Sequence, residues 1–427
     1  MRRFGSFAIG RSRMRNTRIM MISTLIWMSA VPASAQPERA QDSEDWPSRI
    51  SQLRHEMYQR PEQKLIRQQL ATAYNNYGVS LGNQRQWALA ITQLEEALQL
   101  DAQNEQFRTN AGNLYVNQAQ EAYERHQPND ALAALDQAIA VKPDLAQAYA
   151  LRGQVEYDRQ KLKEAQAAWQ RALELDPTLP NLADRLAQVT EELPVESKFR
   201  GSSQAYFDLR YDRQLAEPIG NFDLRDALLD ARRSVGSDLA YWPKYKIVVL
   251  VYSAESFRAL REEVPDWVGG QFDGKIRVPL PSARMDQTTV RQILFHEYTH
   301  ALVHDLTSGQ CPTWLNEGLA EYEGRTQHSP PLQRLKAAHD SQQLIPLGEL
   351  SEHFSTTRSA DDVSVAYEQS YSLAAWLITR YGFWRIRLLL KAVATGQSWE
   401  AAMTEQLHLK PAKLDAAWRA ALPELLR

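Results

Sequence analysis

The chain has 427 residues, with 49 lysine and arginine residues against 52 aspartate and glutamate residues. Hydrophobic content of 44% and charged content of 24% exclude a disordered or collagen-like chain, and the length indicates two or three domains. The first 35 residues hold six arginines and no acid, so the remaining 43 basic residues face 52 acidic ones, which disfavours a nucleic-acid-binding surface. The single cysteine, Cys311, excludes an internal disulfide and a cysteine-based zinc site.

Residues 1–35 have the pattern of a signal peptide. Six arginines up to Arg18 precede an apolar run of 13 residues at 19–31, and Ala33-Ser34-Ala35 follows as a cleavage motif. The run is shorter than the ~20 residues of a membrane-spanning helix, although an uncleaved anchor is the alternative. We therefore expect export to the periplasm or secretion, with cleavage after Ala35. Translation from Met14 is also compatible with the sequence, and residues 36–64 form a polar leader.

Residues 65–192 contain an internal repeat. Three segments share an aromatic residue, a small residue and an alanine at fixed offsets: Tyr74, Gly78 and Ala90; Tyr115, Ala119 and Ala131; Tyr149, Gly153 and Ala165. The repeat spacing is 41 residues and then 34, and the extra seven residues are close to two helical turns. The pattern resembles the tetratricopeptide repeat (TPR), which implies a helical solenoid. Its concave surface would bind a peptide or partner protein, or the repeats would only brace the following domain.

After a linker at 193–203, residues 204–427 read as an α+β domain. Apolar runs at 204–211 and 246–252 predict strands, and 224–239 and 254–262 predict helices. Lys275, Ile276, Arg277 and Val278 alternate in charge and precede Pro279, which predicts an edge strand. After residue 282 every element is expected to be helical, so the fold class is mainly α, with a small sheet in the second domain.

A helix predicted over about 287–306, capped by Asp286, carries the H-E-x-x-H sequence at 296–300. His296 and His300 are four residues apart, so both project from one face of the helix. Two imidazoles so placed can bind one zinc ion, and Glu297 beside them can take a proton from water.

Residues 313–324, TWLNEGLAEYEG, extend this pattern. Together with H-E-x-x-H they resemble the gluzincin metallopeptidases, especially the aminopeptidase-N type. The resemblance implies that Glu317 is the third zinc ligand and that Glu321 supports a ligand histidine. His304 lies on the same helix face, eight residues from His296, and is expected to be structural or to support a ligand. The metzincin pattern fails, because it requires glycine and histidine at the positions of Val303 and Leu306.

Residues 366–373, AYEQSYSL, resemble the Y-E-K-G segment of the aminopeptidase-N type. The resemblance implies that Tyr367 donates a hydrogen bond to the oxyanion, with Tyr371 as the alternative, although Gln369 and Ser370 depart from the pattern. No G-A-M-E-N segment is present, so recognition of a free N-terminus has no support. The strand at 275–277 could instead bind an extended peptide, which favours an endopeptidase.

The sequence thus predicts an exported metallopeptidase that binds one Zn²⁺ per chain, acts on a peptide or protein substrate and does not bind nucleic acid. The alternative is a TPR-based envelope assembly or binding factor whose peptidase fold is latent or inactive. Hydrolysis of a non-peptide substrate is a third possibility, since the same zinc chemistry is not confined to amides.

Overall fold

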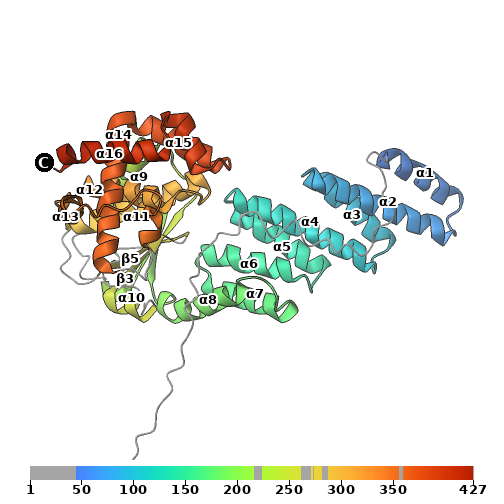
Figure 1. Ribbon diagram of the computed structural model, residues 1–427. Coiled ribbons are helices and arrows are strands. Elements are labelled where there is room, and N and C mark those ends of the chain that lie inside the picture. The colour runs from blue at the N-terminus through green and yellow to red at the C-terminus, as the bar shows by residue number, and fades with distance from the viewer. Residues whose placement is uncertain are drawn as a thin grey trace, which may run out of the picture. The chain divides into compact units, whose positions relative to one another are not determined.

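The computed structural model describes residues 45–215, 224–260, 271–272, 274–280, 287–354 and 359–426. Within these ranges the chain contains sixteen α-helices and one five-stranded sheet (Figure 1). The expected fold class, a helical repeat followed by an α+β region, is therefore confirmed. The expected signal peptide, residues 36–44 of the expected polar leader and Asp286 lie outside the described residues. The rest of the leader is described and contains a helix, α1 (Trp46–Gln59), which the sequence analysis did not predict. Among the helices described, none combines the length and the apolar character needed to cross a membrane.

The repeats form three helix pairs, each joined by a short turn (Figure 1). The pairs are α2 (Lys64–Asn83) with α3 (Trp87–Leu100), α4 (Glu105–Glu124) with α5 (Pro128–Val141), and α6 (Ala146–Asp158) with α7 (Leu162–Leu175). The helix α1 (Trp46–Gln59) precedes them and α8 (Leu182–Glu196) follows them. Helices α2 and α4 have 20 residues and α6 has 13, so the seven extra residues of the longer spacing lengthen the first helix of a pair.

Small side chains allow the paired helices to pack closely. Ala90, Ala131 and Ala165, at equivalent positions of the three repeats, are 0% exposed. Ala119, which stands where the other repeats have glycine, is also 0% exposed. The middle repeat therefore accommodates its departure from the pattern without losing the close contact.

Polar side chains join one repeat to the next. Ring N–H or O–H groups donate to carboxylates 34 or 35 residues further along the chain: Trp87 to Glu121, Tyr123 to Asp158 and Tyr157 to Glu192. The last acceptor lies on α8. This helix therefore occupies the position that the first helix of a fourth repeat would take.

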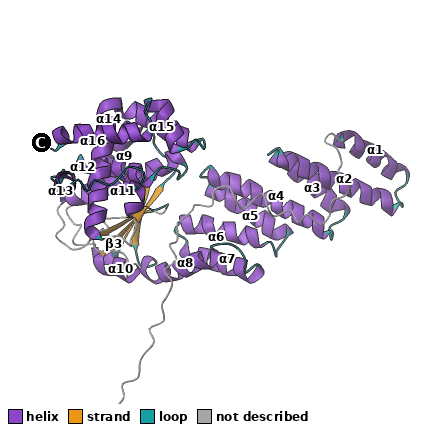
Figure 2. Cartoon of the chain, viewed as in Figure 1, coloured by secondary structure: helices purple, strands orange, loops and turns teal. Residues whose placement is uncertain are grey.

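The sheet of the second domain has the strand order β1-β2-β3-β5-β4. Its strands are β1 (Arg200–Ser203), β2 (Phe207–Tyr211), β3 (Ile247–Ser253), β4 (Gln271–Phe272) and β5 (Ile276–Leu280). The three inner strands β2, β3 and β5 are parallel, and β1 and β4 pair with them antiparallel at the two edges. Figure 2 shows these strands among the helices of the domain.

Side chains alternate between the two faces of the sheet, as strand geometry requires. One face carries Val249, Val251, Ile276 and Val278, all 0% exposed, into the main core with the C-terminal helices. The opposite face contributes Leu250 and neighbouring apolar residues to a smaller core.

Eight helices complete the second domain. They are α9 (Leu224–Leu239), α10 (Ala254–Leu260), α11 (Gln287–Thr307), α12 (Thr313–Arg325), α13 (Gln333–Asp340), α14 (Ala360–Ala394), α15 (Trp399–Leu407) and α16 (Pro411–Leu425). Two 3₁₀ helices are also present: η1 (Arg213–Leu215) follows β2, and η2 (Leu350–Phe354) lies between α13 and α14.

The prediction that Lys275, Ile276 and Arg277 lie on an edge strand open to substrate is wrong. β5 has a partner on both sides, and β4 is the edge strand next to it. Ile276 points into the main core, while Lys275 and Arg277 are each 1% exposed on the opposite face. Instead of facing solvent, Arg277 pairs with two carboxylates of α8, and Lys275 donates a hydrogen bond to Gln160, which follows α6.

The guanidinium of Arg277 lies between two glutamates of α8. Its Nη1 is 2.5 Å from Glu196 Oε1 and its Nη2 is 3.0 Å from Glu192 Oε1. Lys275 Nζ donates to Gln160 Oε1 at 2.7 Å and lies 3.4 Å from the ring centroid of Tyr157. The last solenoid helix is thus bound to the sheet by a buried, charged cluster.

Candidate metal centre

Two adjacent helices, α11 and α12, carry the candidate site. On α11, Leu294, Ala301 and Leu302 are 0% exposed and hold one face of the helix in the core. His296 and His300 project from the face turned toward α12. This division of faces follows from the 3.6-residue period of the helix.

Two glycines of α12 allow its close packing. A Cβ atom at Gly318 would lie 2.4 Å from the backbone oxygen of Ser370 on α14. A Cβ atom at Gly324 would lie 3.1 Å from the backbone oxygen of Gln292 on α11. Helix α12 is thus held closely against both neighbours, and Glu317 on it comes within 3.5 Å of both histidines of α11.

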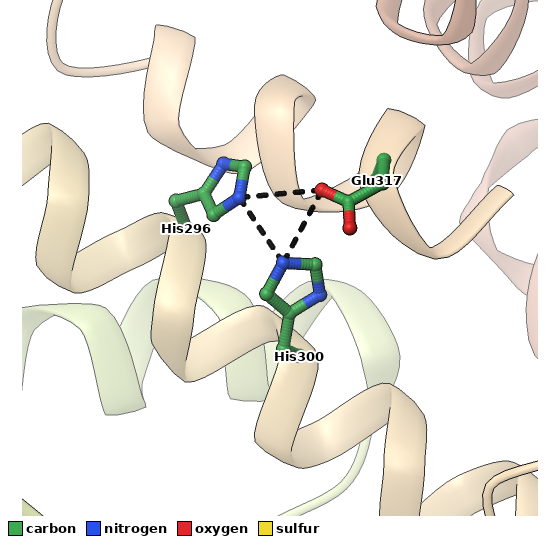
Figure 3. A group of neighbouring side chains, drawn as sticks. All are labelled: His296, His300 and Glu317. Atoms are coloured by element: carbon green, nitrogen blue, oxygen red, sulfur yellow. Dashed lines mark hydrogen bonds and ion pairs between the residues drawn. The ribbon is translucent and has the colours of Figure 1, made fainter. Parts of the chain in front are cut away.

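The structure brings His296, His300 and Glu317 together (Figure 3). The two histidine Nε2 atoms are 3.1 Å apart, and Glu317 Oε2 lies 3.5 Å from that of His296 and 3.4 Å from that of His300. Ligands bound tetrahedrally at about 2.0–2.1 Å are roughly 3.3–3.4 Å apart. Buried Glu317 Oε2 accepts no hydrogen bond from the described residues, as expected of a metal-ligand atom. The three residues therefore fit a divalent metal ion.

Glu321 and Arg325 support the first histidine. Glu321 Oε1 lies 3.3 Å from His296 Nδ1, and Arg325 Nε donates to Glu321 Oε2 at 3.1 Å. A carboxylate in this position fixes the ring orientation and leaves Nε2 for the metal. We did not predict Arg325 from the sequence, although its spacing of four residues from Glu321 on a helix was a usable signal.

Tyr367 and Tyr371 are separated by the structure. Tyr367 lines the cavity that contains the three candidate ligands, and its ring centroid is 6.5 Å from that of His296. The ring of Tyr371 lies under the guanidinium of Arg325 at 4.5 Å. The geometry therefore favours Tyr367 over Tyr371 as a donor to a bound substrate.

Burial shifts the pKa values of the site. Burial raises the pKa of Glu297, and the nearby histidines only partly offset it. Burial also raises the pKa of Tyr367 well above its usual range, and the charge of Glu317 adds to this effect. Burial opposes ionisation of Glu317 as well, but His300 and His296 hold its pKa far below the usual range. The site thus keeps Glu317 ionised and Tyr367 protonated.

Two further residues of the sequence analysis have clear places. Gln369, where the aminopeptidase-N pattern has lysine, exchanges hydrogen bonds with the backbone of Ile345 and is 1% exposed, so it is structural. His304 lines the same cavity as the candidate ligands, together with Phe272 of β4. Phe272 was missed because nothing in the sequence places this short strand at the edge of the sheet.

The comparisons with known proteins agree with this division of the chain. Residues 238–424 match the family model of the Peptidase MA superfamily, and residues 146–179 match that of the tetratricopeptide repeat. No curated protein matches the chain. The first match spans α11, α12 and α14, so the chain combines a metallopeptidase-like domain with TPR repeats.

Two solved structures are similar to part of the chain. One is the first TPR of Spaghetti (RPAP3) bound to the HSP90 peptide SRMEEVD, at 24% identity over 30% of this chain and 94% of that one, with a TM-score of 0.23. The other is the NMR structure of the first TPR domain of human RPAP3, at 23% identity over the same shares, with a TM-score of 0.23.

Proposed function

We propose that this protein is a zinc-dependent metallopeptidase that hydrolyses peptide bonds of exported or cell-envelope proteins. The observation that carries the proposal is the spacing of 3.1–3.5 Å among one carboxylate oxygen and two imidazole nitrogens on adjacent helices. Two histidines and one glutamate are a common ligand set of catalytic zinc, which leaves a fourth position for water or substrate. His296, His300 and Glu317 would hold the ion, and the chemistry supplied there would be a lowered pKa of a water molecule and polarisation of a carbonyl oxygen.

Glu297 is the general base of the proposed reaction. It is 3% exposed, lines the cavity beside the candidate ligands, and its Oε2 accepts no hydrogen bond from the described residues. A carboxylate with a raised pKa in this position can take the proton of the attacking water and pass it to the leaving amine.

Tyr367 stabilises the transition state. Its raised pKa keeps the phenol protonated, so it can donate a hydrogen bond to the negative charge that develops on the carbonyl oxygen.

The edge strand β4 offers a backbone edge to an extended substrate. It lies next to β5 at the end of the sheet, and Phe272 on it lines the cavity. An internal segment of a chain can add to such an edge, so the proposal favours endopeptidase action. The TPR solenoid would bind the substrate or a partner protein, and residues 1–35 would direct export.

The test is hydrolysis of a panel of unfolded proteins by the zinc-loaded full chain and two variants. Glu297→Gln should retain zinc and lose hydrolysis by about 10²–10⁴-fold, because it removes the base and keeps the side-chain size. Glu349→Gln, on an exposed residue, is the matched control and should hydrolyse the panel like the wild type. Stoichiometric zinc without cleavage of any protein would favour the binding-factor alternative. Comparable turnover by Glu297→Gln would remove Glu297 from its role.

A further inference from the structure

The cavity continues past the candidate ligands along the C-terminal turns of α11. Val303, His304 and Thr307 follow His300 on the same helix face and line this extension. Phe272 of β4 forms another wall, with its ring centroid 5.6 Å from that of His304. The whole cavity, candidate ligands included, has a volume of about 260 Å³.

The end of α11 keeps this extension open. Gly309 has a φ of +73°, and its N–H donates to the backbone oxygen of His304 at 2.9 Å, which fixes the loop to the helix. A Cβ atom at position 309 would lie 3.1 Å from His304 Nε2. Glycine therefore leaves that nitrogen facing the cavity.

Besides atoms of Glu297, His300 and Glu317, two buried polar atoms of the cavity lining lack partners among the described residues. Neither His304 Nε2 nor Asn316 Oδ1 has a hydrogen bond with any described residue. On its other side, His304 Nδ1 lies 3.8 Å from Asp305 Oδ1. Asp305 Oδ2 accepts hydrogen bonds from Tyr241 at 3.0 Å and Tyr245 at 2.5 Å, which hold the carboxylate in place. A fixed carboxylate beside Nδ1 favours the tautomer with its proton there, so Nε2 presents a lone pair to the cavity.

We propose that His304 and Asn316 form a specificity pocket for an N–H donor group of the substrate, next to the scissile bond. A buried acceptor without a hydrogen-bond partner is unfavourable, and a donor group in the pocket would satisfy it. The carboxylates of Glu297 and Glu317 in the same cavity disfavour an acidic group there. The inference rests on the proposed peptidase function and adds the chemical class of the residue that is selected.

The donor can be a side-chain amide or ammonium group, or the free amino end of the substrate. The test uses zinc-loaded full-length protein and quenched fluorescent peptides that differ at one position beside the scissile bond: Lys, Gln, Leu or Glu. Each peptide is used with a free and with an acetylated N-terminus. The wild type should prefer donor-bearing peptides by about tenfold or more in kcat/KM, the effect of one hydrogen bond to a buried acceptor.

Variants at position 304 decide whether the pocket sets this preference. His304→Leu should reduce the ratio of donor to leucine peptides to about one, and His304→Gln, which retains an acceptor, should restore part of it. Gln310→Leu, on the exposed loop nearby, should keep the wild-type ratio. A preference for Lys and Gln over Leu among the acetylated peptides identifies the side chain as the donor. A preference for free over acetylated peptides, whatever the side chain, identifies the amino end. The proposal would be overturned if His304→Leu lowered kcat/KM equally for all peptides, or if the wild type showed no preference for donor-bearing peptides.

A binding experiment separates this inference from the proposed function. The same labelled peptides are titrated by fluorescence polarisation into Glu297→Gln and into the double variant Glu297→Gln/His304→Leu. Tighter binding of donor peptides only when His304 is present supports the pocket even if the wild type hydrolyses nothing. Identical affinities in both variants would reject the pocket, whatever the hydrolysis results.

Discussion

Replacing Glu196 by glutamine should destabilise the protein by about 3–5 kcal/mol, the usual cost of breaking a buried ion pair by removing one partner. The side chains of Glu196 and Arg277 are 0% and 1% exposed, so water does not screen their charges. Arg277 holds the pKa of Glu196 below its ordinary value, although burial alone would raise it. Glutamine has nearly the same size as glutamate, so the loss of stability reports the removal of the negative charge rather than a change in packing.

The magnitude is large compared with the stability of a whole domain, about 5–15 kcal/mol. Urea unfolding followed by tryptophan fluorescence should be measured for the wild type, Glu196→Gln, Arg277→Met and the double variant. Because the double variant removes one charge of each sign, it should be less destabilised than the sum of the single variants.

A surface ion pair of similar length provides the control. Arg152 and Asp136 are 2.7 Å apart, but their side chains are 36% and 58% exposed. Asp136→Asn should therefore cost only about 0.2–1 kcal/mol. If Glu196→Gln costs no more than Asp136→Asn, the contact between α8 and the sheet is not buried in solution and the reasoning fails.

Three further predictions concern α12. Burial and the neighbouring carboxyl of Asp238 raise the pKa of Glu323 from 4.5 to about 8, so its contribution to stability is present at low pH and is lost as pH rises through that value. Glu323→Gln should flatten this decline in the thermal unfolding temperature between about pH 5 and pH 9. The same pH dependence in the wild type and the variant would contradict the prediction. Gly318→Ala should lower the free energy of unfolding in urea by about 1–3 kcal/mol, because the added Cβ atom would lie 2.4 Å from a backbone oxygen of α14. In the control Gly348→Ala the added Cβ atom meets nothing within 4 Å, so this variant should be as stable as the wild type. Equal effects of the two substitutions would refute the packing argument. Glu321→Gln should weaken zinc binding by about 10–100-fold in a chelator competition, and unchanged affinity would show that Glu321 does not support the site.

The helical parts of the fold were predictable because their signals are local and periodic. The 34-residue repeat follows from alanines such as Ala131 and Ala165, which must be small for the helices to pair. His296 and His300 could be placed on one face because the helical period alone decides it. Glu317 required the resemblance of its helix to a known family, since no local rule brings two helices together.

The environment of β5 could not be predicted for the opposite reason. Alternating charge at Lys275 and Arg277 is typical of a solvated edge strand, and the partner that reverses this interpretation, Glu196, lies about 80 residues earlier in the chain. The sequence also gave no means of placing Phe272 beside His304. Both cases depend on which distant elements meet in the fold, which strand patterns do not encode.

The central claim is that His296, His300 and Glu317 together bind one zinc ion. The most direct measurement is the zinc content of the full-length protein after equilibrium dialysis against buffered zinc, for the wild type and for Glu317→Gln. We predict about one zinc per chain in the wild type and a large loss of affinity in the variant, because one of three protein ligands loses its charge. A wild type without zinc, or a variant that binds zinc as tightly as the wild type, would contradict the account.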